Sequence, residues 1–99
     1  MPSGNGHWPR TLKEAVRLLL GGLSEHAKLG LKQATGEDLA VLHATLGTII
    51  RNDFGLWSGN TMLLKACGSE TMHPDDASMV IIKAARRELR RREKSQRQK

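Results

Sequence analysis

The sequence predicts an all-α protein: a compact bundle of about four to five helices that continues into a basic C-terminal helical extension. Apolar residues recur at helical spacing in several segments, and residues that cap helices precede these segments. No segment alternates apolar and polar residues as a strand would. With 99 residues, we expect one domain over 10–89, a polar N-terminal arm over 1–9 and a basic tail over 90–99.

The first predicted helix follows the polar arm. Thr11 and Glu14 fit a capping box, in which each side chain binds the other's main chain. Gly21 and Gly22 are expected to end the helix. Its expected buried stripe contains Leu12, Ala15, Val16, Leu19 and Leu23.

Two further helices are predicted before the middle of the chain. Ser24 can cap a short one that reaches about Gln33, and Thr35 can cap a longer one that ends at Asp53 or Phe54. The expected buried residues are Leu29 and Leu31 in the short helix, and Leu39, Leu42, Leu46, Ile49 and Ile50 in the longer one.

The last two helices have equally clear boundaries. Asn60 can cap a short helix over 61–67, and Gly68 is expected to close it. Pro74 suits the first turn of the final helix, where its missing N–H would have no partner. The expected buried stripe of that helix contains Ala77, Val80, Ile81, Ala84, Ala85 and Leu89.

The positive charge is concentrated at the C-terminus. Residues 1–82 carry seven Lys or Arg and eight Asp or Glu, whereas residues 83–99 carry nine and two. The body is therefore almost neutral, and any nucleic-acid binding is confined to the terminal segment. The lone Cys67 cannot form an internal disulfide, and neither a signal segment nor a membrane-spanning run is visible. We expect a cytoplasmic protein with no membrane contact.

The turn over residues 51–60 is the leading candidate for a ligand site. Arginine can hold a phosphate with two hydrogen bonds, tryptophan can stack on a base, and the following helix start favours an anion. The predicted ligand-binding residues are Trp8, Arg10, Arg51, Asn52, Trp57 and Asn60. The structural alternative makes Phe54, Leu56 and Trp57 core anchors, with Arg51 paired to an acidic side chain.

Metal-dependent and nucleophilic chemistry have weaker support. His73, Asp75 and Asp76 could in principle bind a hard metal, but adjacent carboxylates at a helix start point in different directions. Cys67 and Ser78 lack the sequence context of a catalytic nucleophile. We therefore expect no enzyme activity, metal or cofactor.

The basic run over 83–99, which includes the tail, is the alternative binding site. Its cations can neutralise phosphates and would give salt-sensitive binding to nucleic acid. The residues concerned are Arg86, Arg87, Arg90, Arg91, Arg92 and Lys94. The opposing interpretation is a solvated helical extension, because cations are favoured near a helix C-terminus.

Three motifs resemble those of a small family of unknown function that we associate with bacteria and their phages. They are Trp8-Pro9-x-Thr11-x-x-Glu14-Ala15-Val16, Ile50-Arg51-Asn52-Asp53-Phe54-Gly55-Leu56-Trp57-x-Gly59-Asn60 and His73-Pro74-Asp75-Asp76-Ala77-Ser78-x-Val80-Ile81-Ile82. The resemblance covers about residues 8–89 and leaves out the basic tail. It implies a compact helical domain and is compatible with a phage or prophage origin, but it implies no activity.

The expected function is a non-catalytic binding protein that sequesters a phosphorylated small ligand, such as a nucleotide second messenger. Because so small a bundle offers little concavity, we expect a homo-oligomer whose subunit interface provides the pocket. The alternative is an accessory or inhibitor protein that binds a host protein or nucleic acid through its basic C-terminal helix.

Overall fold

The computed structural model describes residues 8–97, with side chains as far as Lys94, and this range contains five helices and no strand. The helices are α1 (Leu12–Gly21), α2 (Glu25–Lys32), α3 (Gly36–Asp53), α4 (Thr61–Cys67) and α5 (Pro74–Arg97). The all-α prediction is confirmed. Residues 1–7 of the expected arm and 98–99 of the tail lie outside the described residues.

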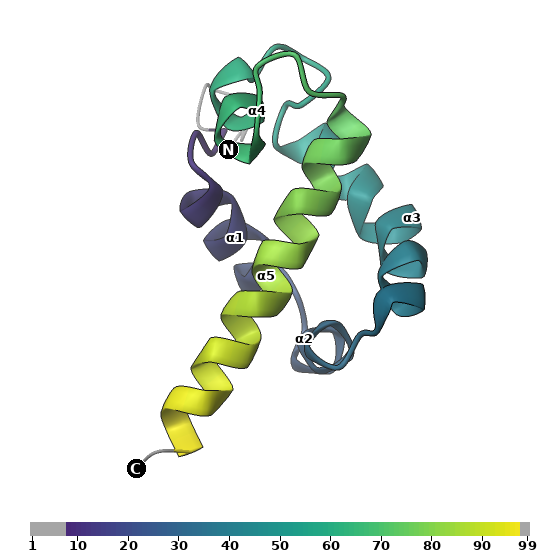
Figure 1. Cartoon of the computed structure of the whole chain (residues 1–99), viewed down its shortest axis with the longest axis vertical. Coiled ribbons are helices and arrows are strands. Elements are labelled where there is room, and N and C mark those ends of the chain that lie inside the picture. Colours follow the sequence, from purple (N-terminus) through teal and green to yellow (C-terminus); the bar gives the residue numbers. More distant parts are fainter. Residues whose placement is uncertain (1–7, 98–99) are drawn as a thin grey trace.

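Helix α5 is the centre of the bundle. It runs the length of the molecule, and each of the other four helices packs against it. Helices α1 and α4 lie on one side of α5, and α3 lies on the other (Figure 1). Within residues 8–97, no helix combines the length and hydrophobicity that crossing a membrane requires.

The predicted helix starts are confirmed. The capping side chains each accept a hydrogen bond from a main-chain N–H in the first turn, and they are Thr11, Ser24, Thr35 and Asn60. One detail was wrong: the Glu14 carboxylate accepts from the main-chain N–H of Arg10 rather than from Thr11. The reciprocal capping box belongs to α3, between Thr35 and Asp38.

The core is aliphatic and gathers around α5. Its largest fully buried apolar side chains are Leu20, Leu31, Ile50, Leu63, Ile81 and Ile82. Two expected core residues were wrong: Leu29 is 45% exposed and Ile49 is 51% exposed. The buried residues are instead Leu31, on the opposite side of α2 from Leu29, and Ile50, about 100° around α3 from Ile49.

The segments that flank the expected helical domain are joined to it at both ends. Pro9 is buried, and its carbonyl accepts a hydrogen bond from the side chain of Asn60. At the other end, α5 continues without a break past Leu89. Part of the expected arm and the first turns of the expected tail are therefore built into the fold.

Candidate functional site

Asn60, the last residue of the predicted ligand turn, joins three segments of the chain. Its Nδ2 donates to the carbonyls of Pro9 and Phe54, each at 2.8 Å, and its Oδ1 accepts from the N–H of Leu63 at 3.3 Å. The residue is only 6% exposed. Both of its amide groups are therefore occupied inside the protein, which gives Asn60 a structural role.

Trp8 covers the same turn from outside. Gly55 adopts a φ of +71°, a backbone conformation that favours glycine. A Cβ atom at this position would overlap the indole ring of Trp8. The tryptophan is thus packed directly against the turn's main chain, an arrangement that fixes the N-terminal segment to the end of α3.

Arg51 connects α3 to the start of α5. Its Nη1 lies 3.2 Å from a carboxylate oxygen of Asp75 and donates to Ser78 Oγ at 3.3 Å. Only 17% of the Arg51 side chain is exposed. Gly47 leaves room for the guanidinium of Arg51, because a Cβ atom on residue 47 would lie only 2.8 Å from Nη1 of Arg51. The structure therefore pairs the guanidinium with an acidic side chain, as the structural alternative held.

We expect Arg51→Ala to lower the free energy of unfolding by about 1–2 kcal/mol, because charge-assisted hydrogen bonds between α3 and α5 are lost. Urea unfolding followed by circular dichroism measures this change. Arg10→Ala is the matched control, since Arg10 is exposed and should shift stability by less than about 0.5 kcal/mol. Equal stability of Arg51→Ala and the wild-type protein would contradict the structural role.

Ser78 and His43 form a hydrogen-bonded pair beside Arg51. His43 Nε2 lies 2.8 Å from Ser78 Oγ and 3.0 Å from the main-chain carbonyl of Asp75. A carbonyl only accepts, so Nε2 is the donor in this contact. Ser78 is completely buried. A substrate therefore cannot reach its hydroxyl, and the pair serves to join α3 to α5.

The surroundings of Cys67 and His73 do not indicate a nucleophile or a metal site. Burial raises the pKa of the Cys67 thiol to about 11, which keeps it protonated at neutral pH. The Nδ1 of His73 accepts from the N–H of Asp75 in the first turn of α5. Among the residues that the structure describes, no three His, Cys, Asp or Glu side chains are grouped as a metal site would require.

The remaining predicted ligand residues lie on the surface. Trp57 is 58% exposed, and its ring meets that of His73 edge-on, with centroids 5.3 Å apart. Asn52 and Arg10 are also exposed. Trp8, Arg51 and Asn60 thus connect the predicted turn to other parts of the fold, and the turn exposes the aromatic ring of Trp57.

Two arginines of the basic run over 83–99 bind the end of α2. Arg86 donates to the carbonyl of Ala34 at 2.9 Å, and Arg90 donates to that carbonyl and to the carbonyl of Lys32. These carbonyls lie at or just beyond the C-terminus of α2, where unpaired oxygens attract cations. Arg86 and Arg90 are therefore occupied by the fold.

A carboxylate holds the next two arginines. Glu88 accepts from Nε and Nη2 of Arg91 at 2.9 and 2.7 Å, and from Nε of Arg92 at 2.8 Å. Hydrogen bonds from Arg91 and then Arg92 lower the pKa of Glu88 to about 2. Glu88 consequently stays ionised above that pH and orders both guanidinium groups.

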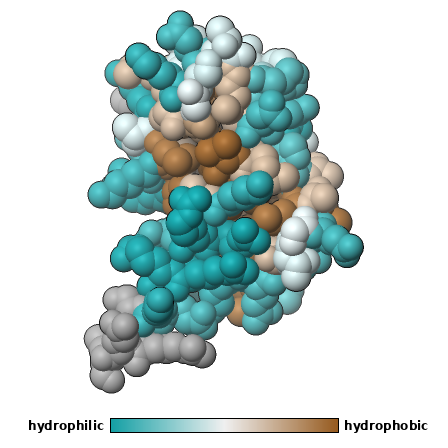
Figure 2. All heavy atoms as spheres, in the orientation of Figure 1, coloured by the Kyte–Doolittle hydropathy of each residue, from teal (hydrophilic) through white to brown (hydrophobic). Residues whose placement is uncertain are grey.

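A groove between α1 and α5 collects these cations. Its volume is about 510 Å³. Its basic lining residues are Lys13, Arg17, Arg87, Arg91 and Arg92, and Glu88 is the acidic one. Apolar side chains, those of Leu12, Val16 and Ala84, complete the lining. Figure 2 shows hydrophilic residues gathered over the C-terminal half of α5, next to a hydrophobic band.

The two helices place like charges one turn apart on both sides of the groove. Lys13 and Arg17 are four residues apart on α1, as are Arg87 and Arg91 on α5. Such pairs repel and weaken an isolated helix. Within the described part of the chain, no ion pair engages Lys13, Arg17 or Arg87. The groove therefore concentrates positive charge that the protein itself compensates only in part.

Lys13 and Arg17, the cations that α1 contributes to the groove, were not among the residues predicted from the sequence. The charge count indicates a cationic site only in residues 83–99, because Lys13 and Arg17 belong to the nearly neutral body. Their signal was the spacing of four residues beside the buried stripe of Leu12 and Val16. This spacing places both cations at the edge of the face that packs on α5.

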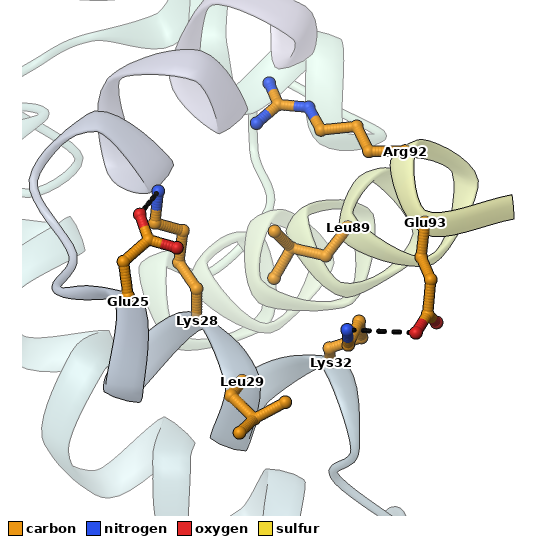
Figure 3. A pocket seen from close by; sticks show the side chains of 7 residues that line it. All are labelled: Glu25, Lys28, Leu29, Lys32, Leu89, Arg92 and Glu93. Atoms are coloured by element: carbon orange, nitrogen blue, oxygen red, sulfur yellow. Dashed lines mark hydrogen bonds and ion pairs between the residues drawn. The ribbon is translucent and has the colours of Figure 1, made fainter. Parts of the chain in front are cut away.

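A second cleft, on the other flank of α5, is electrically balanced. Its volume is about 480 Å³, and Leu29 of α2 and Leu89 of α5 are the apolar residues that line it (Figure 3). Two ion pairs border it, Glu25 with Lys28 and Lys32 with Glu93. Arg92 contributes to the lining of both clefts. Because its other charges are paired, this cleft is less suited to an anion than the α1–α5 groove.

Comparison with known proteins adds the family but no activity. No curated protein and no solved structure matches the chain. The model of one family, described as Domain of unknown function (DUF6794), matches residues 8–89. This match covers most of the chain and shows that the protein belongs to that family.

Proposed function

We propose that this member of the DUF6794 family is a non-catalytic binding protein that holds a phosphorylated small ligand in the groove between α1 and α5. One observation carries the proposal: the groove has five basic side chains and one acidic side chain in its lining. The basic residues come from two helices, so an anion between them can be approached from both sides. The proposal therefore assigns the ligand to this groove and not to the turn over residues 51–60.

The side chains of the groove suit phosphate chemistry. Guanidinium groups bind phosphate oxygens with paired hydrogen bonds and remain charged at every physiological pH. Glu88 already orders Arg91 and Arg92, which reduces the entropy that binding would otherwise cost. Each guanidinium keeps N–H groups beyond those that Glu88 accepts. Anion binding therefore does not require the Glu88 contacts to break.

The size and lining of the groove favour a small organic phosphate. A volume of about 510 Å³ falls within the range of roughly 300–1,000 Å³ typical of small-molecule sites. The apolar side chains of Leu12, Val16 and Ala84 can contact the uncharged part of a ligand. A nucleotide combines both requirements, since its phosphates are anionic and its base has apolar faces.

Isothermal titration calorimetry with linear and cyclic nucleotides tests the proposal. Arg17→Ala and Arg87→Ala should each weaken binding roughly ten- to a hundredfold, because each removes one charge-assisted contact. Lys65→Ala is the control: this exposed cation belongs to α4 and does not line the groove. A wild-type protein that binds no member of the panel would refute the small-ligand function.

A second candidate function is nucleic-acid binding along α5. One observation favours it: α5 carries a further exposed cation, Lys94, beyond the residues that line the groove. We expect such binding to fall steeply with salt, because phosphate contacts release counterions. Fluorescence anisotropy with a labelled DNA duplex measures it. Lys94→Ala should weaken only this contact and leave nucleotide titrations unchanged, which separates the two functions.

A further inference from the structure

The outer face of α3 is exposed and uncharged. Between Asp38 and Arg51 the helix contains no Asp, Glu, Lys or Arg. The exposed residues of this stretch are Ala40, Val41, Ala44, Thr45, Thr48 and Ile49; we call them the α3 face. Large apolar side chains of a surface helix normally face the core, but Val41 and Ile49 are exposed while α3 packs on α5 with another side.

The polar groups of the α3 face already have partners. Thr45 Oγ1 donates to the carbonyl of Leu42 at 3.1 Å, and Thr48 Oγ1 donates to that of Ala44 at 3.5 Å. With their hydroxyls bonded to their own helix, the threonines can present methyl groups. Covering the α3 face would therefore leave no polar side chain without a hydrogen bond, which is a condition for a dry interface.

The largest side chains of the α3 face remain in water. Val41 is 67% exposed and Ile49 is 51% exposed. They are eight residues apart, or about 12 Å along the helix axis, and smaller residues lie between them. At about 100° per residue the two side chains lie roughly 80° apart around the axis, so the α3 face is a broad strip with a large apolar side chain near each end.

We propose that the α3 face binds the α3 face of a second copy of this chain, with the two helices antiparallel about a two-fold axis. In such an isologous contact, each copy offers the same surface to the other. The uncharged face matches itself without leaving any charge unpaired, whereas the basic surface of α1 and α5 would repel its own copy. Antiparallel packing also opposes the two helix dipoles.

The size of the α3 face sets the expected strength of the dimer. The helix has 18 residues, so it is about 27 Å long and roughly 10 Å wide. This footprint is smaller than the roughly 800 Å² per partner of a standard stable interface. We therefore expect a dimer that forms and dissociates with concentration. Helix α1, which lines the groove together with α5, lies on the other side of α5 from α3 (Figure 1), so this dimer would leave the groove open.

Sedimentation velocity of the full chain from micromolar to millimolar concentration tests this inference. The wild-type protein should shift from monomer to dimer as the concentration rises. Val41→Glu and Ile49→Glu should each raise the dissociation constant at least tenfold, because the two-fold axis brings two buried carboxylates into one interface. Met62→Glu is the matched control, an apolar α4 residue that is 58% exposed, and it should dimerise like the wild type.

Three results would overturn the inference. They are a wild-type protein that stays monomeric throughout, a dimer that neither glutamate variant weakens, and a dimer that Met62→Glu weakens equally. Circular dichroism of each variant verifies that the helices are retained. Val41 and Ile49 are both solvent-exposed, so two independent substitutions report on the same face, and neither depends on the proposed ligand.

Discussion

Asn60→Ala is expected to destabilise the protein by about 3 kcal/mol, because a helix cap is lost and two buried carbonyl groups lose their donor. The carbonyls belong to Pro9 and Phe54, so the N-terminal segment and the end of α3 both lose their tie to α4. Domains of this kind have only about 5–15 kcal/mol of total stability. Urea unfolding should therefore show a large decrease in the midpoint.

Asn60→Asp separates the contribution of the two N–H donors of Asn60 from that of its oxygen, which caps α4. It preserves the shape of the side chain and the oxygen that accepts from Leu63, but it removes both N–H donors. A carboxylate oxygen would then face the two carbonyls, and a charge would be buried at a residue that is 6% exposed. We expect destabilisation at least as large as in Asn60→Ala. If both variants unfolded at the same urea concentration as the wild-type protein, Asn60 would have no structural role and would be available to a ligand.

The sequence was informative wherever the structure is determined locally. The helix caps at Thr11, Ser24 and Thr35 involve groups within three residues along the chain. Their hydrogen bonds therefore follow from short patterns, and the five predicted helices were found with nearly the predicted ends. The same reasoning holds for Asn60, whose role as a cap was predicted correctly.

Choosing the buried face of a helix needed information from elsewhere in the chain. In α3 the apolar residues surround the axis, so periodicity alone does not separate Ile49 from Ile50. The packing of α3 on α5 makes the choice, and it buries Ile50. In α2 the same ambiguity left Leu29 at the surface and Leu31 in the core.

The groove that we propose as the ligand site differs from the predicted turn for a related reason. Residues 51–60 looked available because their partners are distant in sequence: Asn60 contacts Pro9, and Arg51 contacts Asp75. The α1–α5 groove was not predicted for the opposite reason: Arg17 and Arg87 are far apart in the sequence and line one groove only after folding. Local chemistry indicates which residues can bind an anion, whereas tertiary packing decides which of them remain free to do so.

Gly55→Ala is expected to lower the free energy of unfolding by about 2–5 kcal/mol, from two separate causes. A non-glycine residue in the left-handed region costs about 1–2 kcal/mol, and Gly55 has a φ of +71°. The new methyl group would also overlap the indole of Trp8, and overpacking of this kind costs roughly 1–3 kcal/mol. Thermal and urea unfolding of the variant measure the total.

Gly59→Ala and Trp8→Ala separate the two causes of this loss. Gly59 also has a positive φ, of +101°, but a Cβ there meets no atom within 4 Å. Gly59→Ala should therefore show backbone strain without the clash. In a double-mutant cycle, Gly55→Ala should cost less when Trp8 is already alanine, because the overlap is gone. Strict additivity of the two substitutions would contradict direct packing of Trp8 on the turn, and with it the structural role assigned to the first family motif.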